Sequence, residues 1–157
     1  MSDRRRFSLF ATLLRERFPA VKRVFDVAGG MGRLNAELAL LGIGAVTFDR
    51  RTKRLDVRYA ERPFSLEEPC VCELVAGLHP DGATRRIIEY AARHRIPFAV
   101  VPCCSDNGMS YRPWVRHLTE LASSLGLAVE ETRLDMAGRS LVLLGRPRAP
   151  KGTTATG

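Results

Sequence analysis

The sequence lacks any long apolar run. None of its hydrophobic stretches approaches the roughly 20 residues that a membrane-spanning helix needs, so no membrane helix is expected. It also lacks internal repeats, low-complexity segments and a linker that would separate two halves. With 157 residues, of which 45% are hydrophobic and 27% charged, the chain predicts one globular domain. We expect that domain to cover residues 1–148 and a disordered tail to cover residues 149–157.

The amino-terminal segment has a basic start and several apolar residues, a combination that targeting sequences also show. Charged residues at 15–17 interrupt its apolar stretch, and no small-residue cleavage site follows. The periodicity favours an amphipathic helix from Phe7 to Phe18, with Phe7, Phe10, Leu14 and Phe18 facing inward. We therefore expect a cytoplasmic protein.

Acidic residues are scarce relative to basic ones. The 25 lysines and arginines outnumber 17 aspartates and glutamates, which gives a net charge of +8 and a pI near 10.0, and nearly all the basic residues are arginine. Guanidinium groups match the geometry of phosphates, so this balance indicates a polyanionic partner such as RNA. The alternative is that the arginines serve only solubility.

Cysteines are few, and their spacing is wrong for a metal site. They fall as Cys70 and Cys72, and as Cys103 and Cys104, whereas structural zinc sites use pairs separated by two to four residues. In a cytosolic chain, thiols are more common than disulfides. We therefore expect no metal centre.

The rest of the chain alternates apolar runs typical of strands with amphipathic helical stretches. The expected strands cover residues 24–28, 45–48, 55–59, 70–80 and 96–104, and the expected helices cover residues 34–41, 81–95 and 114–126. This alternation predicts an α/β domain with a mostly parallel sheet of six or seven strands and helices on both faces. Residues 127–147 predict a terminal hairpin with a tight turn at 136–138, which requires one antiparallel strand.

A glycine-rich turn joins the first strand to the helix that follows. The sequence there reads Asp26-Val27-Ala28-Gly29-Gly30-Met31-Gly32, and the next strand ends on Asp49. Glycines allow the backbone to turn sharply and to approach a ligand closely, and an acid about 20 residues further on can accept hydrogen bonds from ribose hydroxyls. This arrangement predicts a nucleoside-containing ligand at the carboxyl ends of the first two strands.

An acid followed by alternating small residues resembles the first motif, D/E-x-G-x-G-x-G, of the Rossmann-like S-adenosylmethionine-dependent methyltransferases. Ala28 stands in place of the first glycine. Nicotinamide-binding proteins use a different spacing, G-x-G-x-x-G. The terminal hairpin favours the same family, because the seventh strand of these methyltransferases is antiparallel and lies between the fifth and the sixth. The resemblance covers residues 21–146 and implies S-adenosylmethionine as the cofactor.

A second resemblance is narrower. The stretch Leu78-His79-Pro80-Asp81-Gly82-Ala83-Thr84 and the pair Cys103-Cys104 are similar to a subgroup that has a Leu-His-x-x-Gly motif after the fourth strand and Cys-Cys after the fifth. That subgroup includes a tRNA ribose methylase, so the resemblance implies methyl transfer to RNA, either tRNA or rRNA. The alternatives are a methyltransferase for small metabolites and a cofactor-binding protein without catalysis that associates with RNA.

The resemblance to the methyltransferases also implies roles for individual residues. Asp26 would face the ammonium of the cofactor, Asp49 would hold its ribose, and Asp56 would meet the adenine amino group. For Asp49 and Asp56, the alternative is a solvated surface acid. The remaining expected cofactor contacts are Ala28, Gly29, Gly30, Gly32, Arg50, Gly77 and Leu78.

His79 and Asp81 occupy the position at which these methyltransferases transfer the methyl group. Either side chain could serve as the general base for a hydroxyl acceptor. Asp81 would equally suit a helix cap, given its place before the predicted helix. For Cys103 and Cys104, shaping the pocket is a better interpretation than thiolate attack on a pyrimidine, because the fourth strand lacks the matching second motif.

Substrate contacts are expected at the same edge of the sheet. The residues assigned to them are Arg51, Arg54, Cys103, Cys104, Tyr111 and Arg112. Trp114 is better explained as helix core than as a stacking residue. Because ligands gather at the carboxyl ends of parallel strands, arginines that follow the second strand should lie near RNA, whereas Arg146 and Arg148 should lie at the opposite edge.

Overall fold

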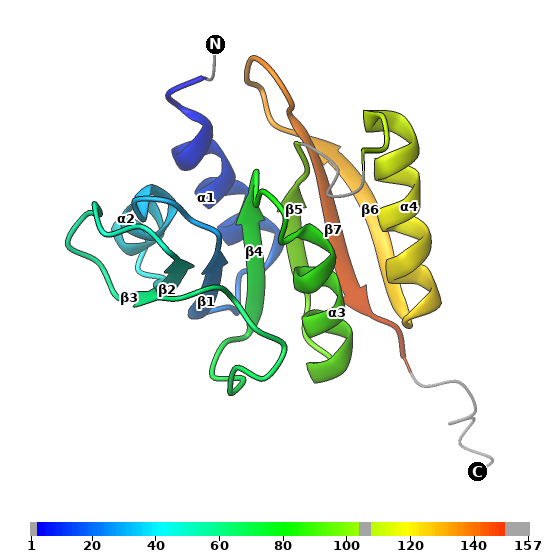
Figure 1. The fold of residues 1–157 in the computed structure, drawn as a ribbon, viewed down its shortest axis with the longest axis horizontal. Helices are drawn as coiled ribbons and strands as arrows, with labels where there is room; N and C mark the ends of the chain where they lie inside the picture. The colour runs from blue at the N-terminus through cyan, green and yellow to red at the C-terminus, as the bar shows by residue number, and fades with distance from the viewer. Residues whose placement is uncertain (1–2, 104–107, 150–157) are drawn as a thin grey trace.

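The computed structural model describes residues 3–103 and 108–149, and it contains one sheet of seven strands in the order β3-β2-β1-β4-β5-β7-β6 (Figure 1). The strands are β1 (Arg23–Val27), β2 (Gly44–Asp49), β3 (Tyr59–Glu61), β4 (Leu74–Leu78), β5 (Phe98–Val101), β6 (Leu127–Arg133) and β7 (Leu141–Pro147). The helices are α1 (Arg6–Arg17), α2 (Arg33–Leu40), α3 (Thr84–His94) and α4 (Tyr111–Ser124). Nearly all of the predicted tail, and Cys104, lie outside the described residues. Within those residues, no helix has the length and apolarity to cross a membrane.

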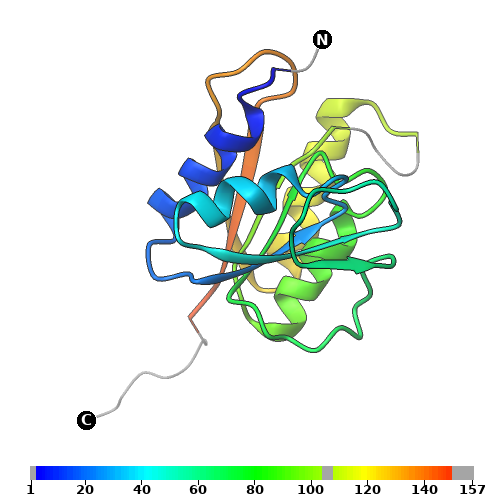
Figure 2. The same cartoon turned by 90° about the vertical axis from the view of Figure 1, so that its left-hand side faces the viewer.

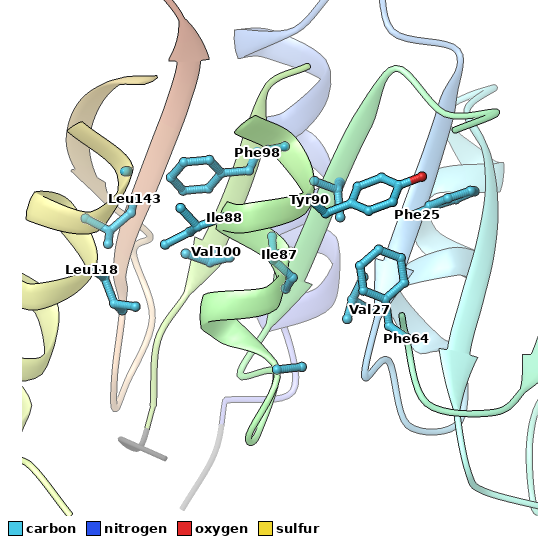
Figure 3. Packing of buried hydrophobic residues seen from close by; sticks show 14 of the residues in the cluster. Phe25, Val27, Phe64, Ile87, Ile88, Tyr90, Phe98, Val100, Leu118 and Leu143 are labelled. Carbon is cyan, nitrogen blue, oxygen red and sulfur yellow. The ribbon is translucent and has the colours of Figure 1, made fainter. Parts of the chain in front are cut away.

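The sheet is covered on both faces, α1 and α2 lying on one side and α3 and α4 on the other (Figure 2). Side chains alternate along each strand, so each strand contributes to two separate cores. Phe98 and Val100 of β5 pack with α3 and α4, and Figure 3 shows them beside Ile88. Ala99 and Val101 pack in the second core with α1 and α2. The predicted leading helix is confirmed, since Phe10 and Leu14 of α1 are buried in this core.

Strands β1 to β5 pair in parallel, whereas β7 pairs antiparallel with both β5 and β6. The expected α/β sheet, with its antiparallel seventh strand between the fifth and the sixth, is therefore confirmed. Because parallel strands end at the same edge, the segments that follow β1, β2, β4 and β5 gather there. We call this edge, formed by residues 28–32, 50–58, 79–83 and 102–103, the carboxyl edge.

Several element boundaries differ from the predictions. The fourth strand is Leu74–Leu78 rather than 70–80, and the fifth is Phe98–Val101 rather than 96–104. The third strand is Tyr59–Glu61 rather than 55–59, because residues 55–58 fold over the glycine turn instead, where the Leu55 amide donates to the Met31 carbonyl at 2.9 Å. The terminal hairpin has no tight turn: residues 134–140 connect β6 to β7 and bend toward Asp3, whose carboxylate accepts from the Ala137 amide. Helix α4 begins earlier than expected, at residue 111.

The topology also places cysteines, and arginines, at different edges of the sheet. Cys72 precedes β4 and Cys103 follows β5, so these two cysteines lie at opposite edges of the sheet. No three histidine, cysteine, aspartate or glutamate side chains gather as metal ligands in the part of the chain that the structure describes. Arg146 and Arg148 lie away from the carboxyl edge, their guanidinium groups donating to the Arg17 carbonyl and the Ser123 hydroxyl.

Candidate active site

The glycine turn after β1 adopts a conformation that explains its composition. Gly30 and Gly32 have φ angles of 61° and 89°, in the left-handed region that side chains disfavour. A Cβ atom on Gly32 would also come within 2.6 Å of a methyl group of Val57. Ala28, the residue in place of the family's first glycine, has a φ of 53° and therefore carries backbone strain.

We expect Ala28→Gly to raise the free energy of unfolding by about 1 kcal/mol, because glycine adopts the left-handed region without strain. Urea denaturation measures the change. Ala137→Gly is the matched control, since Ala137 is exposed in a loop and does not have a positive φ. Its replacement should leave stability unchanged or lower it. Equal shifts in the same direction for both variants would contradict strain at Ala28.

Gly30 of the glycine turn forms hydrogen bonds with residues of β2 and β3. One carboxylate oxygen of Asp49, Oδ2, accepts a hydrogen bond from the Gly30 amide at 2.7 Å, and Oδ1 accepts from the Arg50 amide at 2.6 Å. The Tyr59 hydroxyl donates to the Gly30 carbonyl at 2.5 Å. Carboxylate oxygens can each accept more than one hydrogen bond, so Asp49 retains capacity for a ligand at the rim of the turn.

Asp26 lies beneath the turn in the second core. Its Oδ2 atom accepts a hydrogen bond from the Thr47 hydroxyl at 2.8 Å, and the Asn35 amide donates in turn to that hydroxyl at 3.1 Å. Its Oδ1 atom has no hydrogen-bond partner in the described structure. Burial raises the pKa of Asp26 to about 7; the Thr47 hydrogen bond opposes this rise, and the charge of Asp49 adds to it.

Two hollows flank the turn and meet at Ala28. The α3-side hollow, of about 260 Å³, is lined by Val27, Ala28, Phe48, Asp49, Arg50, Pro63, Phe64, Asp81, Gly82, Ala83 and Arg86. The α1-side hollow, of about 220 Å³, is lined by Arg6, Phe7, Ala28, Gly29, Gly30, Met31, Arg33, Arg51, Leu78 and His79. The carboxyl edge thus offers one elongated site divided by the end of β1.

His79 directly follows β4 at the α1-side hollow. Its φ of 51° is unusual for a non-glycine residue, and its Nε2 atom lies 3.1 Å from the carbonyl oxygen of Arg139. A carbonyl can only accept, so Nε2 carries the proton of this hydrogen bond. Burial lowers the pKa of His79; the Arg139 carbonyl opposes this effect, and the charge of Arg6 adds to it. The neutral ring therefore presents Nδ1 as an acceptor.

Neither the protein-family models nor the curated proteins include a match to this sequence. Solved structures do match in shape. The sugar N-methyltransferase KedS8 from Streptoalloteichus shares 13% identity with a TM-score of 0.64, over 91% of this chain and 87% of that one. A ribosomal protein L11 methylase from Lactobacillus delbrueckii shares 16% with a TM-score of 0.66, over 88% and 77%. The fold is that of the class I methyltransferases.

A third match to this methyltransferase fold is a precorrin-6y C5,15-methyltransferase from Geobacter metallireducens, at 12% identity and a TM-score of 0.63, over 88% of this chain and 87% of that one. The three proteins are named for different substrates: a sugar, a ribosomal protein and a precorrin. At these identities the likeness establishes the fold, and the substrate has to be argued from this chain's own residues.

The methyltransferase fold brings half of the predicted site residues to the two hollows. Those lining them are Ala28, Gly29, Gly30, Asp49, Arg50, Arg51, Leu78, His79 and Asp81. Sequence reasoning missed Pro63 and Phe64, which follow β3, because the third strand was placed too early. Tyr59 was included in the predicted third strand, but its hydrogen bond to the Gly30 carbonyl was not predicted.

Five predicted residues that precede β5 lie outside both hollows. Asp56 is exposed and precedes β3, outside both hollows. Asp26 is sealed beneath the turn, and Gly32 packs on Val57 rather than lining a hollow. A Cβ atom on Gly77 would meet Ile87 of α3 at 2.6 Å, so this glycine serves packing.

The fifth of these residues, Arg54, contacts two residues of β3. Its guanidinium forms an ion pair with Glu61 at 2.9 Å and lies 4.6 Å from the ring centroid of Tyr59. These contacts brace β3 and keep Arg54 away from both hollows.

The capping alternative for Asp81 is wrong. Helix α3 begins at Thr84 after Ala83, and no side chain caps it. Asp81 is exposed at the α3-side hollow, whereas His79 lies at the α1-side hollow, so the two candidate bases face different parts of the site.

The predicted substrate residues after β5 are separated by a gap in the described chain. Cys103 is half-buried at the end of β5, and Tyr111 and exposed Arg112 open α4. Trp114 is 1% exposed in the core, which confirms its interpretation as helix core.

Proposed function

We propose that this protein is an S-adenosylmethionine-dependent methyltransferase that acts on RNA, with tRNA or rRNA as the substrate. The observation that carries the proposal is the elongated site at the carboxyl edge. The glycine turn divides this site, and Asp49 stands at its rim with its carboxylate already oriented by the Gly30 amide. S-adenosylmethionine has an adenosine part and an amino-acid part, and the two hollows provide one place for each.

The α3-side hollow suits the adenosine. Phe48, Pro63 and Phe64 give it an apolar wall for a purine, and Asp49 stands where ribose hydroxyls can donate to it. Asp81 is the second acid at this hollow, and it replaces Asp56 in our assignment as the acceptor for the adenine amino group. The amino-acid part then lies along residues 29–31, above the buried carboxyl of Asp26.

This placement brings the methyl donor to the junction of the hollows, beside His79. Methyl transfer is an in-line displacement, and holding donor and acceptor aligned supplies much of its acceleration. A ribose hydroxyl acceptor has to lose its proton as it attacks, and Nδ1 of neutral His79 is the acceptor that we assign to it. The hydrogen bond from Nε2 to the Arg139 carbonyl fixes the ring for this role.

RNA is favoured as the substrate by the charge around the α1-side hollow. Arg6, Arg33 and Arg51 line it, although they come from α1, α2 and the segment after β2. Three guanidinium groups converging on a methyl-transfer site suit an acceptor that carries phosphates. The net charge of +8 supports the same conclusion.

We expect Asp49→Ala to weaken S-adenosylmethionine binding at least about tenfold. A hydrogen bond to a charged acceptor contributes about 1.5–3 kcal/mol, and about 1.4 kcal/mol already corresponds to a factor of ten. Calorimetric titration measures the change. Asp49→Asn is the control for the turn, because its amide oxygen can still accept from the Gly30 amide. Full recovery of affinity in Asp49→Asn would assign the effect to the turn rather than to ribose.

The proposed function is tested by transfer of tritiated methyl groups from labelled S-adenosylmethionine. The protein is incubated separately with RNA from a strain that lacks it and with a metabolite extract from the same strain. We expect label in the RNA, and mass spectrometry of its nucleosides then identifies the methylated atom. Label in the extract alone would show a small-molecule methyltransferase. No label in either, with cofactor binding intact, would show a binding protein without catalysis.

A further inference from the structure

A third hollow, of about 510 Å³, lies between α4 and the strands β6 and β7. Four arginines line it, together with an aromatic residue at one end. The lining residues are Tyr111, Arg112, Val115, Arg116, Thr119, Glu131, Arg133, Arg139 and Leu141. We call it the arginine groove. It belongs to neither hollow of the candidate active site.

The four arginines reach the groove from three separate elements. Arg112 and Arg116 are four residues apart on α4 and so share one face of the helix. Arg133 ends β6, and Arg139 lies in the connection between β6 and β7. Their convergence is therefore a property of the fold and not of a basic run in the sequence.

In the part of the chain that the structure describes, the charges of these four arginines have no ion-pair partner. Within the described residues, seven ion pairs form, and each uses an arginine outside the groove. Glu131 lines the groove but forms no ion pair there with any of its four arginines. Like charges held close together destabilise a fold, and a bound anion removes that repulsion. The groove has the electrostatics of an anion site.

Arg139 connects the groove to the candidate active site. Its backbone carbonyl accepts the hydrogen bond from Nε2 of His79, and its guanidinium lies 3.8 Å from the ring centroid of Tyr111. An RNA strand bound along the groove would therefore have one end next to His79, the residue to which we assign proton removal.

We propose that the arginine groove binds the phosphate backbone of a single RNA strand and leads one of its nucleotides to His79. This inference rests on the proposed function and names where its substrate is held. Arginine forks bind phosphate oxygens through paired hydrogen bonds, and guanidinium planes and aromatic rings stack on unpaired bases. Tyr111 and Arg139 supply such surfaces at the end nearest the site. An acidic protein segment would use the charges but not these surfaces.

The test is a charge reversal at two exposed arginines that line neither hollow of the candidate active site, Arg112→Glu with Arg116→Glu. Fluorescence anisotropy measures binding of a labelled single-stranded RNA over a series of salt concentrations. We expect affinity to fall at least about tenfold, because two charge-assisted contacts are lost. The salt dependence should weaken by about 1.4 in slope, at about 0.7 for each phosphate contact.

The matched control reverses two exposed charges at the opposite edge, Arg15→Glu with Lys22→Glu, which changes the net charge equally. We expect this variant to retain RNA affinity within about twofold. Equal losses in the two variants, or no loss in the groove variant, would overturn the proposal. Polyglutamate that displaces the RNA as well as unlabelled RNA does would also overturn it, in favour of an acidic protein partner.

Methyl transfer in the same preparations separates this proposal from the function on which it rests. If the wild-type protein methylates RNA and the groove variant binds RNA normally, the RNA-binding role of the groove is contradicted and the proposed function is not. Wild-type protein that fails to methylate RNA, alongside a groove variant that loses RNA binding, would contradict the proposed function alone. Cofactor affinity should be the same in all three proteins and confirms that each is folded.

Discussion

Replacing Gly29 with alanine is expected to lower the free energy of unfolding by about 3 kcal/mol, the upper end for overpacking a buried site. A Cβ atom at this position would lie within 3.0 Å of all three outer atoms of the Asp26 carboxyl group. The carboxyl group cannot move aside, because it is buried and accepts a hydrogen bond from the Thr47 hydroxyl. That hydroxyl in turn accepts a hydrogen bond from the Asn35 amide. In a domain of this size the melting temperature should fall by roughly 6–12 °C.

A double-mutant cycle tests whether the contact with the Asp26 carboxyl group causes this loss of stability. In an Asp26→Ala background the carboxyl group is gone, so adding Gly29→Ala should cost less than about 1 kcal/mol. Gly44→Ala is the control for a glycine in β2, since its added Cβ would make an ordinary contact at 3.6 Å. A Gly29→Ala protein as stable as the Gly44→Ala protein would refute the close contact between the turn and Asp26.

The second large effect concerns Asp26 and pH. We expect the wild-type protein without cofactor to lose stability as the pH rises from 4 to 8, and Asp26→Asn to remove most of that loss. A carboxyl pKa raised from 3.8 to about 7 corresponds to about 4 kcal/mol. Asparagine stays neutral throughout, and its side-chain oxygen can still accept from Thr47. Urea denaturation at intervals across this range measures both proteins.

The direction of this pH dependence follows from the titration of Asp26 in the folded and in the unfolded chain. Below the ordinary pKa, Asp26 is protonated in the folded and the unfolded chain, and its contribution to stability is fully present. As the pH rises toward 7, the unfolded chain releases the proton and the folded chain keeps it, so folding becomes less favourable. Above the folded pKa the loss is complete. Parallel pH profiles for the two proteins would contradict a buried, proton-binding Asp26.

Much of the fold could be predicted because its strands and helices have clear periodicity. The apolar runs that became β1, β2, β4 and β5 are short and continuous, as expected for strands buried on both faces. The third strand was misplaced because it is three residues long and lies in a charged segment, where pattern gives little information. The hairpin turn was misjudged because Gly138 suggested a tight turn, whereas contacts with Asp3 determine a longer loop.

The candidate site was predictable only where the chain passes directly from a strand into a motif. Asp49 ends β2, and Ala28 and His79 directly follow β1 and β4, so the parallel topology alone brings them together. Phe64 and the arginine groove depend on segments distant in sequence meeting in space. No local pattern shows that Arg116 and Arg133 share a hollow, or that Asp56 lies outside one.

The measurement that tests the central claim most directly is a calorimetric titration of the unmodified protein with S-adenosylmethionine, S-adenosylhomocysteine and NAD. The site at the carboxyl edge has room for an adenosine and an amino-acid part around Ala28, and its turn lacks the G-x-G-x-x-G spacing of nicotinamide-binding proteins. We therefore expect the first two compounds to bind at a single site and NAD to bind poorly. Tight binding of NAD, with no heat from either S-adenosyl compound, would contradict the account.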